Sequence, residues 1–314
     1  MEPKVVYDVF HEMPWGITTA SYMFVAALAA GTYLAVVLLN RAHKAEYGPV
    51  VRTGAVVAAV LGLLIPVLLV SELRQPLRFI TVLFRVNPTS PMSWGAWIMT
   101  LFVIAAVLYA WFIHKKDLQS ARKVELPGAV LAVLIPLYTG LELSFAKTNP
   151  LWQSGMSPVF SLLGMLLGGV AVTIVVMKLA AGATLVAPEG ARFAGKEASA
   201  TSEGVAGGIV FSLGKLLSLL VVVNLLLIFT TLLTLSNATA EGAIIAGNIL
   251  AGMPLGLLFW LGELVIGIIL PLFFLWYPKT AKTISGPFWA SVCVLVGLYV
   301  QKIVEVIGGQ SAIF

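Results

Sequence analysis

Two tyrosines and a glutamate have the side-chain types and the spacing of a site that binds a ligand oxygen and exchanges protons with it. Tyr22 follows Trp15 by seven residues and Tyr138 precedes Phe145 by seven, each inside a long apolar run. At about 1.5 Å per helical residue, both hydroxyls are expected about 10 Å from the ends of their helices. Glu142 comes four residues after Tyr138, on the same helical face. The pattern predicts a pocket that combines hydroxyl donors with a carboxylate.

Two further polar residues fit the same pocket. Thr19 lies three residues before Tyr22, and Glu72 ends the next apolar run on the same side. Hydroxyls would hold a ligand oxygen, while Glu72 or Glu142 would exchange protons with it. A second interpretation stays open: both tyrosines belong to a belt of interfacial aromatic residues, and Glu142 faces water beside a loop.

Glu263 differs from these residues because it lies near the middle of an apolar run, W-L-G-E-L-V-I-G. A carboxylate at that depth must be protonated, paired, or hydrated by a cavity. A place on a proton path and a structural hydrogen bond between helices both fit this position. Lys302 and Glu305, near the last apolar run, are expected at the membrane interface.

The composition places all these residues in an all-α polytopic membrane protein. Of 314 residues, 60% are hydrophobic and 11% charged, and the mean hydropathy is +1.00, outside the range of soluble globular proteins. Eight apolar runs are long enough for membrane spans. They cover residues 15–39, 53–70, 94–113, 126–145, 159–180, 209–235, 254–276 and 288–307. Residues 243–253 are predicted to form an interfacial segment, and seven or nine spans remain open alternatives.

A flexible loop from Gly182 to Gly208, rich in Ala, Gly, Glu and Ser, separates the first spans from the last ones. We expect two four-helix bundles, residues 1–157 with the tyrosine pocket and residues 158–314 with Glu263. The first bundle also contains the polar hairpin of residues 71–97. Glu72 and Arg74 begin this hairpin, a short interfacial helix is predicted from Phe79 onward, and Trp94 would anchor the next span.

Lysine and arginine predict the orientation in the membrane. Thirteen of the 19 basic residues fall on one side of the eight spans. The other six are Lys4, Arg74, Arg78, Arg85, Lys147 and Lys302. Because cytoplasmic loops carry the excess of Lys and Arg, both termini and the hairpin are predicted to face outward.

Several classes of site are excluded by residue type. The chain has one cysteine, Cys293, which rules out a disulfide framework and any iron–sulfur or zinc site made by cysteines of this chain. His11, His43 and His114 lie outside or at the edge of the spans, so we expect no haem and no metal ligands within the membrane. The net charge of +5 reflects basic cytoplasmic loops, and nucleic-acid binding is not expected.

Four segments, in order along the first half of the chain, carry a resemblance to a known family. They are S-Y-M-F-V-A-A-L-A-A-G (21–31), E-L-R-Q-P-L-R-F followed by N-P-T-S-P-M-S-W-G-A-W (72–97), Y-T-G-L-E-L-S (138–144) and N-P-L-W-Q-S-G (149–155). Together they resemble the NrfD-like, polysulfide-reductase-type subunits, which are quinone-reactive membrane subunits of respiratory oxidoreductases.

The resemblance implies roles for individual residues. Tyr22 stands where family members place a quinone-contacting side chain, Thr19 where a further polar contact occurs, and Tyr138 at the quinone-binding tyrosine. Glu72 replaces the usual Asp, and Arg74 matches the usual Arg.

Two positions depart from the family pattern. Gln75 interrupts the common Gly-Arg-Pro order, and Glu142 replaces a residue that is more often apolar. These departures affect the expected proton route more than the family resemblance.

The resemblance also implies cofactors and partners. Quinone or quinol, of the menaquinone type or similar, would bind at the outward face of a prokaryotic inner membrane. Electrons would pass to or from an iron–sulfur, ferredoxin-like subunit, which would dock on the outward loops 74–94 and 147–156. A catalytic subunit, often of the molybdopterin type, would carry the other reaction, and this chain would handle protons.

Two other functions remain as alternatives. Kinked helices and a buried Glu263 also suit a small secondary transporter or proton channel. A passive membrane anchor without a quinone site is the other. Copurification with iron–sulfur and catalytic subunits would argue against the transporter, and binding of a quinone analogue would argue against the passive anchor.

Overall fold

The computed structural model describes residues 15–42, 48–71, 79–85, 87, 90–145, 149–153, 155–185, 196–281, 283 and 285–311. Within these residues, eight helices are long and apolar enough to cross a membrane, as the sequence predicted. The chain is therefore an all-α, multi-pass membrane protein.

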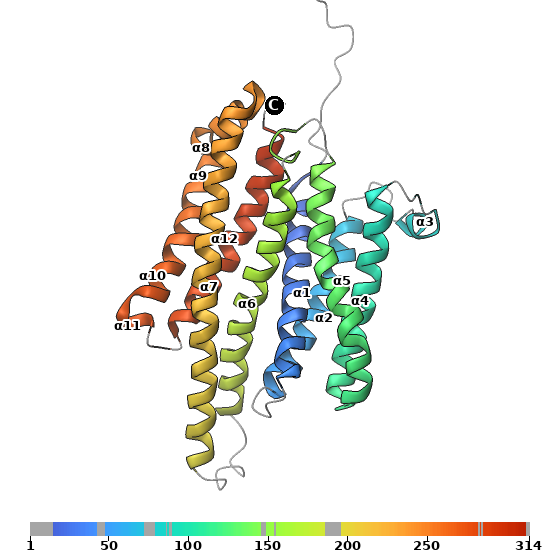
Figure 1. Cartoon of the computed structure of the whole chain (residues 1–314), viewed down its shortest axis with the longest axis vertical. Helices are drawn as coiled ribbons and strands as arrows, with labels where there is room; N and C mark the ends of the chain where they lie inside the picture. The colour runs from blue at the N-terminus through green and yellow to red at the C-terminus, as the bar shows by residue number, and fades with distance from the viewer. Residues whose placement is uncertain are drawn as a thin grey trace, which may run out of the picture.

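The first half of the chain contains four long helices and one short one (Figure 1). They are α1 (Ile17–Arg41), α2 (Gly48–Ser71), α3 (Phe79–Phe84), α4 (Pro91–His114) and α5 (Leu118–Ser144). The four long helices pack side by side, α1 against α2 and α5, and α4 against α2 and α5. The short helix α3 projects from the side of this group.

The second half begins with α6 (Met156–Leu185) and the very long α7 (Lys196–Ala238). After these come α8 (Ala240–Ala251), α9 (Leu255–Leu257), the π-helical segment η4 (Leu258–Ile269), α10 (Leu270–Trp276), α11 (Pro278–Ala281) and α12 (Ser285–Gly309). Helix α8 matches the separate segment predicted at residues 243–253. Helix α12 packs against η4, α10 and α6.

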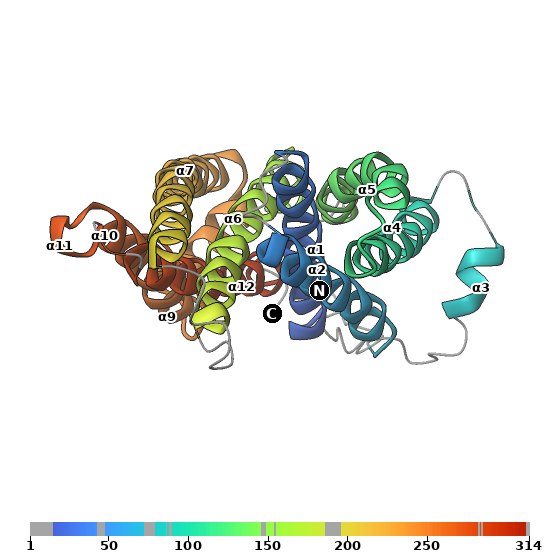
Figure 2. The ribbon, with the colours of Figure 1, turned by 90° about the horizontal axis from the view of Figure 1, so that it is seen from below.

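Helix α6 lies between the two halves, as the view from below shows (Figure 2). It contacts α1 and α5 on one side and α7 and α12 on the other. Gly31 of α1 and Gly169 of α6 meet backbone to backbone, and a Cβ on either glycine would overlap the other helix. This contact brings the two halves together, while their division into two bundles at residue 157 stays a prediction.

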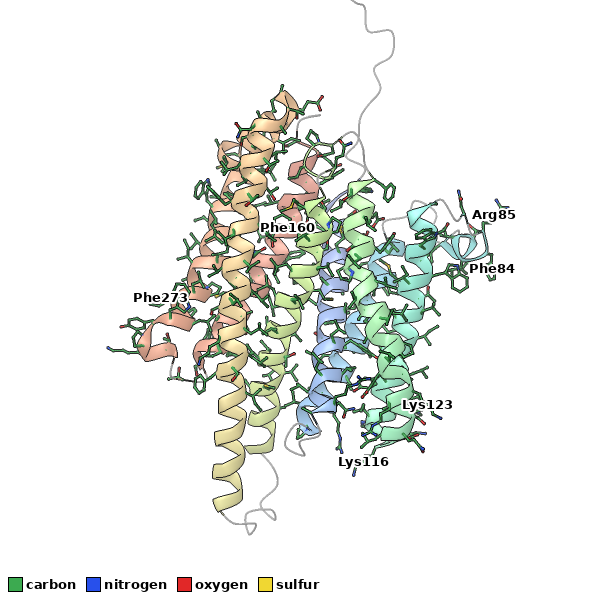
Figure 3. All side chains as sticks on the ribbon, in the orientation of Figure 1. Phe84, Arg85, Lys116, Lys123, Phe160 and Phe273 are labelled. Atoms are coloured by element: carbon green, nitrogen blue, oxygen red, sulfur yellow. The ribbon has the colours of Figure 1, made fainter. Side chains whose placement is uncertain are left out.

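Basic residues lie at the lower end of the helix array. Lys116 and Lys123 mark the lower end in Figure 3, where α4 turns into α5. Asp117 begins α5 there by accepting a hydrogen bond of 3.1 Å from the N–H of Ser120. Hydrogen bonds from Ser120 hold the pKa of the exposed Asp117 carboxyl below its usual value. The C-terminus of α12 lies at the opposite, upper end.

Candidate functional site

Three of the predicted site residues meet near the upper end of the first four helices. The Tyr22 hydroxyl of α1 donates a hydrogen bond to the Glu142 carboxylate of α5. Tyr138, one helical turn before Glu142, also hydrogen-bonds to it. Both tyrosines are buried, with 2% and 8% of their surface exposed, while Glu142 is half-buried. Two hydroxyls from different helices thus converge on one carboxylate close to the helix ends.

Thr19 and Gly95 complete the surroundings of this cluster. Thr19 is buried on α1, one turn before Tyr22. Gly95 of α4 lies against the ring of Tyr138, and a Cβ at this position would overlap the ring atoms. Sequence reasoning included Gly95 in the motif W-G-A-W without giving it a role. The sequence could not reveal this role, because it depends on the contact with Tyr138, which lies on a different helix.

The other predicted residues of the hairpin, Glu72 and Arg74, lie outside the described residues. The described part of α2 ends at Ser71, at the upper end of the helix array. The predicted interfacial helix exists as α3, whose Phe84 is 82% exposed. Phe84 and Arg85 are both exposed at the end of this short helix, which Figure 3 shows at the side of the other helices.

The loop before α6 does not expose its tryptophan. Trp152 is 4% exposed, and its indole N–H donates to the Glu305 carbonyl of α12 at 2.7 Å. Asn149 donates to the Gly309 carbonyl at the end of the same helix. Loop 147–156 was predicted to contribute to a docking surface, but the Trp152 ring cannot take part in it, because α12 buries the ring.

A second carboxylate cluster lies at the lower end of the same helices. Glu125 of α5 is 1% exposed. It accepts hydrogen bonds from the Asn40 side chain at 2.6 Å, from the Arg41 guanidinium at 3.0 Å and from the Tyr109 hydroxyl at 3.4 Å. Sequence reasoning missed Glu125 because it directly precedes the apolar run that was taken as the fourth span. Its partners tie α1, α4 and α5 together.

Glu263 lies inside the second half, on the π-helical segment η4, and is 4% exposed. Its carboxyl hydrogen-bonds to the Gln301 side chain of α12. Gln301 in turn exchanges two amide hydrogen bonds, of 3.2 and 3.4 Å, with Asn224 of α7. The chain of contacts links three membrane-spanning segments.

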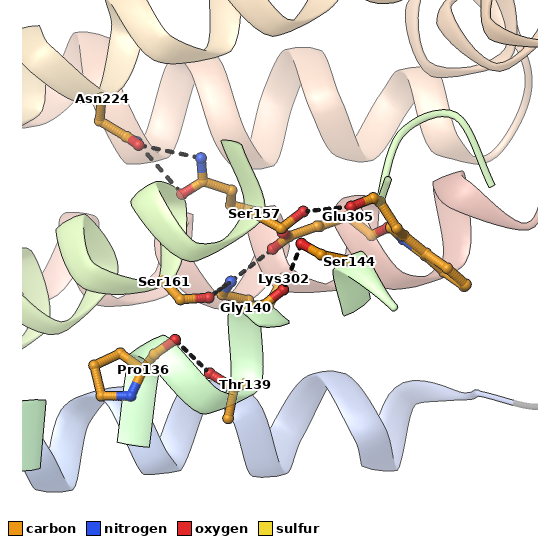
Figure 4. A network of polar contacts seen from close by, with 11 residues as sticks. Pro136, Thr139, Gly140, Ser144, Ser157, Ser161, Asn224, Lys302 and Glu305 are labelled. Atoms are coloured by element: carbon orange, nitrogen blue, oxygen red, sulfur yellow. Dashed lines mark hydrogen bonds and ion pairs between the residues drawn. The ribbon is translucent and has the colours of Figure 1, made fainter. Parts of the chain in front are cut away.

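Lys302 and Glu305 are buried beside Glu263 rather than interfacial. The Lys302 ammonium contacts the Glu305 carboxylate at 2.6 Å and the Ser161 hydroxyl of α6 at 3.4 Å (Figure 4). Their side chains are only 7% and 11% exposed. The sequence expectation was wrong because α6 covers this face of α12, which the apolar pattern of α12 alone does not reveal.

Metal binding has no support among the described residues. No group of three or more His, Cys, Asp or Glu side chains lies close enough there to hold a metal ion. Tyr22, Tyr138 and Glu142 together offer two phenols and one carboxyl group. This set of side chains suits hydrogen bonding to an organic oxygen.

Comparisons with known proteins agree with one another. Over 329 residues, the protein is 24% identical to the C subunit of polysulfide reductase from Wolinella succinogenes, covering 97% of this protein and 96% of that one. It is 30% identical to protein NrfD of Escherichia coli over 198 residues, which are 54% of this protein and 61% of that one, less than two thirds of its length.

A third relative comes from an archaeon. The Hdr-like menaquinol oxidoreductase integral membrane subunit of Archaeoglobus fulgidus is 24% identical over 149 residues, 47% of this protein and 38% of that one. The family model described as "Polysulphide reductase, NrfD" matches residues 6–313, almost the full length. With a match of this extent, and eight helices among the described residues that are long and apolar enough to cross a membrane, the chain belongs to the NrfD, polysulphide reductase family.

Proposed function

We propose that this chain is the quinone-reactive membrane subunit of a respiratory oxidoreductase. The observation that carries the proposal is the convergence of the Tyr22 and Tyr138 hydroxyls on Glu142. A quinone headgroup has ring oxygens on a flat apolar ring, so it needs neutral donors within apolar walls. The name of one relative, a menaquinol oxidoreductase subunit, supports a quinone of the menaquinone type.

The residues of the cluster fit this ligand. Tyr22 and Tyr138 each have one hydroxyl proton to donate, and both now donate to Glu142. A ligand oxygen at this place would compete with Glu142 for the same donors, and Thr19 lies on the same face of α1. When bound, a quinone supplies chemistry of two electrons and two protons. Glu142 is half-buried near the helix end, so it can exchange protons between this pocket and water.

Glu72 is proposed as the alternative proton exchanger, and Arg74 as a residue that holds charge beside it. In the sequence both follow Ser71, the last described residue of α2, and this end of α2 lies at the upper end of the helix array. Their roles rest on this placement and on the resemblance.

The upper end of the helices is proposed to face outward from a prokaryotic inner membrane, with both termini on that side. An iron–sulfur subunit would dock there and exchange electrons with the quinone pool through this chain, and a molybdopterin-type or other catalytic subunit would bind beyond it. The exposed Phe84 and Arg85 of the hairpin suit such an interface. The basic lower end supports this orientation.

Glu263 is proposed to lie on a proton path in the second half of the chain. Its burial next to the Lys302–Glu305 pair is the observation that also favours the second candidate function, a proton channel or small transporter. The two functions differ in their need for partners. A transporter would be active alone, whereas an oxidoreductase subunit would copurify with iron–sulfur and catalytic subunits.

Tyrosine-to-phenylalanine variants test the proposed quinone site. Loss of one hydrogen bond, worth about 0.5–1.5 kcal/mol, should raise the quinol KM about 2- to 13-fold in Tyr138→Phe or Tyr22→Phe. Quinol turnover is measured on the purified complex after its subunit content has been checked. Tyr33→Phe is the matched control, because its hydroxyl donates to the Val124 carbonyl at the lower end. Unchanged kinetics in both variants and in the double variant would place the site elsewhere.

A further inference from the structure

A small cavity lies beside Glu263, between α6, α7, α8, η4 and α12. It offers about 60 Å³ to water, and Phe160, labelled in Figure 3, forms part of its wall. Its polar lining consists of Ser157, Thr231, Glu263, Gln301 and Glu305. A buried water needs roughly 10–15 Å³ of such space and two to four polar partners, so this cavity can hold a few waters.

The charges around the cavity are unbalanced if every carboxyl group is ionised. The Lys302 ammonium already pairs with Glu305 at 2.6 Å, and Glu263 lies within electrostatic range of both. One ammonium offsets one carboxylate, and a second buried negative charge is costly in an apolar surrounding. Glu263 therefore needs either a bound proton or water. The cavity supplies room for water at the carboxyl group.

Thr231 gives an independent sign of water in this cavity. Its neighbours on α7, Thr230 and Thr234, donate to carbonyls one turn earlier, at 2.8 Å each. Thr231 is one of two side chains with a buried polar atom that has no hydrogen-bond partner among the described residues. A buried hydroxyl without a partner costs about 1–3 kcal/mol, and a rotation of Thr231 that turns its hydroxyl toward water in the cavity would remove this cost.

A groove at the upper end is lined by the same residue, Thr231. It has a volume of about 520 Å³ and lies between the loop before α6 and the end of α7. Its polar lining consists of Gln153, Thr231, Thr234, Thr239 and Glu241. Thr231 and Leu151 line both this groove and the cavity beside Glu263. The groove and the cavity are thus separated by the side chains that they share.

Directly below Glu263, η4 and α12 are in close contact. One turn below it, Gly267 of η4 meets Gly297 of α12 so closely that a Cβ on either would overlap the other backbone. Ile268, next to Gly267, and Val294, one turn before Gly297, are both buried. Backbone contact between helices leaves no room for water there.

We propose that water enters from the upper-end groove past Thr231 and reaches Glu263, so that Glu263 exchanges its proton with the upper side of the membrane only. This route extends the proton path proposed above for Glu263. It also places proton exchange in the second half of the chain on the same side as the tyrosine cluster of the first half. Thr231 and Gln301 position the water, and Lys302 and Glu305 set the charge that Glu263 meets.

Cysteine labelling tests the route without any quinone assay. The single cysteine is first removed by the substitution Cys293→Ala. In this background, Thr231→Cys and Thr234→Cys are introduced separately. The complex is placed in vesicles, and a charged, membrane-impermeant methanethiosulfonate is added to one side at a time. Both variants should react from the upper side. Neither should react from the lower side, because only a thiolate in contact with water is labelled.

Two positions on the same helix serve as controls. Leu226 and Phe229 are 59% and 60% exposed on the outer face of α7, where lipid would cover them. Labelling of Thr231→Cys should be at least about tenfold faster than labelling of Leu226→Cys or Phe229→Cys, since thiolates do not form in lipid. If Thr234→Cys reacts and Thr231→Cys does not, or if Thr231→Cys reacts from the lower side, the route is wrong.

Infrared spectroscopy tests Glu263 in the otherwise native chain. The carboxylic acid band that disappears in Glu263→Gln should shift within the mixing time when H₂O is exchanged for D₂O. A band that exchanges no faster than the amides of the surrounding helices would overturn the proposal. Both readouts are independent of turnover. A failed quinone site would change the tyrosine variants only, and a failed water route would change the labelling and the exchange only.

Discussion

The tyrosine cluster and the Glu263 cluster both bury a carboxyl group, but they do so with different partners. Glu142 receives hydrogen bonds from two neutral phenols and stays half-buried near a helix end. Glu263 is 4% exposed and lies beside a buried Lys–Glu pair and a cavity. Neutral hydroxyls can move their hydrogen bonds from Glu142 to an entering ligand at little electrostatic cost. A buried charged pair must stay intact, because breaking it leaves an unpaired charge in the interior. This difference supports the proposal that the first cluster binds the ligand and the second holds a proton.

The largest expected effect comes from breaking the charged pair. Lys302→Met leaves Glu305 without its ammonium, next to a second carboxyl group, and should lower the stability of the protein by about 3–5 kcal/mol. Unfolding in detergent, followed by circular dichroism, measures the loss. The double variant Lys302→Met/Glu305→Leu removes both charges and should recover most of the stability. If Lys302→Met were as stable as the double variant, an unpaired Glu305 carboxylate would carry no desolvation cost, which would contradict its burial.

A steric change in the first cluster should have an intermediate effect. Gly95→Ala places a methyl group where the Tyr138 ring lies, and overpacking of this kind costs about 1–3 kcal/mol. Displacement of Tyr138 should also raise the quinol KM of the purified complex. Gly164→Ala on α6 is the control, because no atom lies within 4 Å of the added methyl group. Equal quinol kinetics in Gly95→Ala and Gly164→Ala would show that Tyr138 does not contribute to quinol binding.

Asp117 provides the exposed reference for these buried carboxyl groups, and its effect should be the smallest. Its pKa is lowered in the folded protein by hydrogen bonds from Ser120, so its contribution to stability is present above the ordinary pKa of about 3.9. The contribution is lost as the pH falls through the lower folded-state value. Asp117→Asn keeps a capping oxygen and cannot titrate. The stability difference between wild type and variant should therefore shrink between pH 5 and strongly acidic pH, measured by thermal unfolding. A difference that is independent of pH would contradict this role.

Most of the architecture could be predicted from the sequence because apolar length alone determines a membrane span. All eight predicted spans lie in helices, and the break before Pro254 and the short helix after Phe79 also follow from local signals. Tyr22, Tyr138 and Glu142 could be grouped because equal distances from helix ends give equal depths.

The remaining features depend on contacts between helices that periodicity does not encode. Gly95 gains its role from the Tyr138 ring of another helix, and Lys302 is buried because α6 covers it. Glu125 precedes an apolar run, and only the approach of Asn40 and Arg41 identifies it as interior. The π-helical geometry around Glu263 shifts side chains from the positions that a 3.6-residue repeat predicts.

The loop at residues 149–153 illustrates how a connection can belong to the packed interior. Asn149 and Trp152 bond to carbonyls of α12, and the Trp152 ring lies 4.8 Å from that of Trp15, centroid to centroid. Three segments that are distant in sequence are thus fastened at one place. Loops usually tolerate insertions, but here a lengthened loop would pull away from α12 and from the start of α1. Protein engineers who need an insertion site for a tag or a fluorescent domain should therefore avoid this loop.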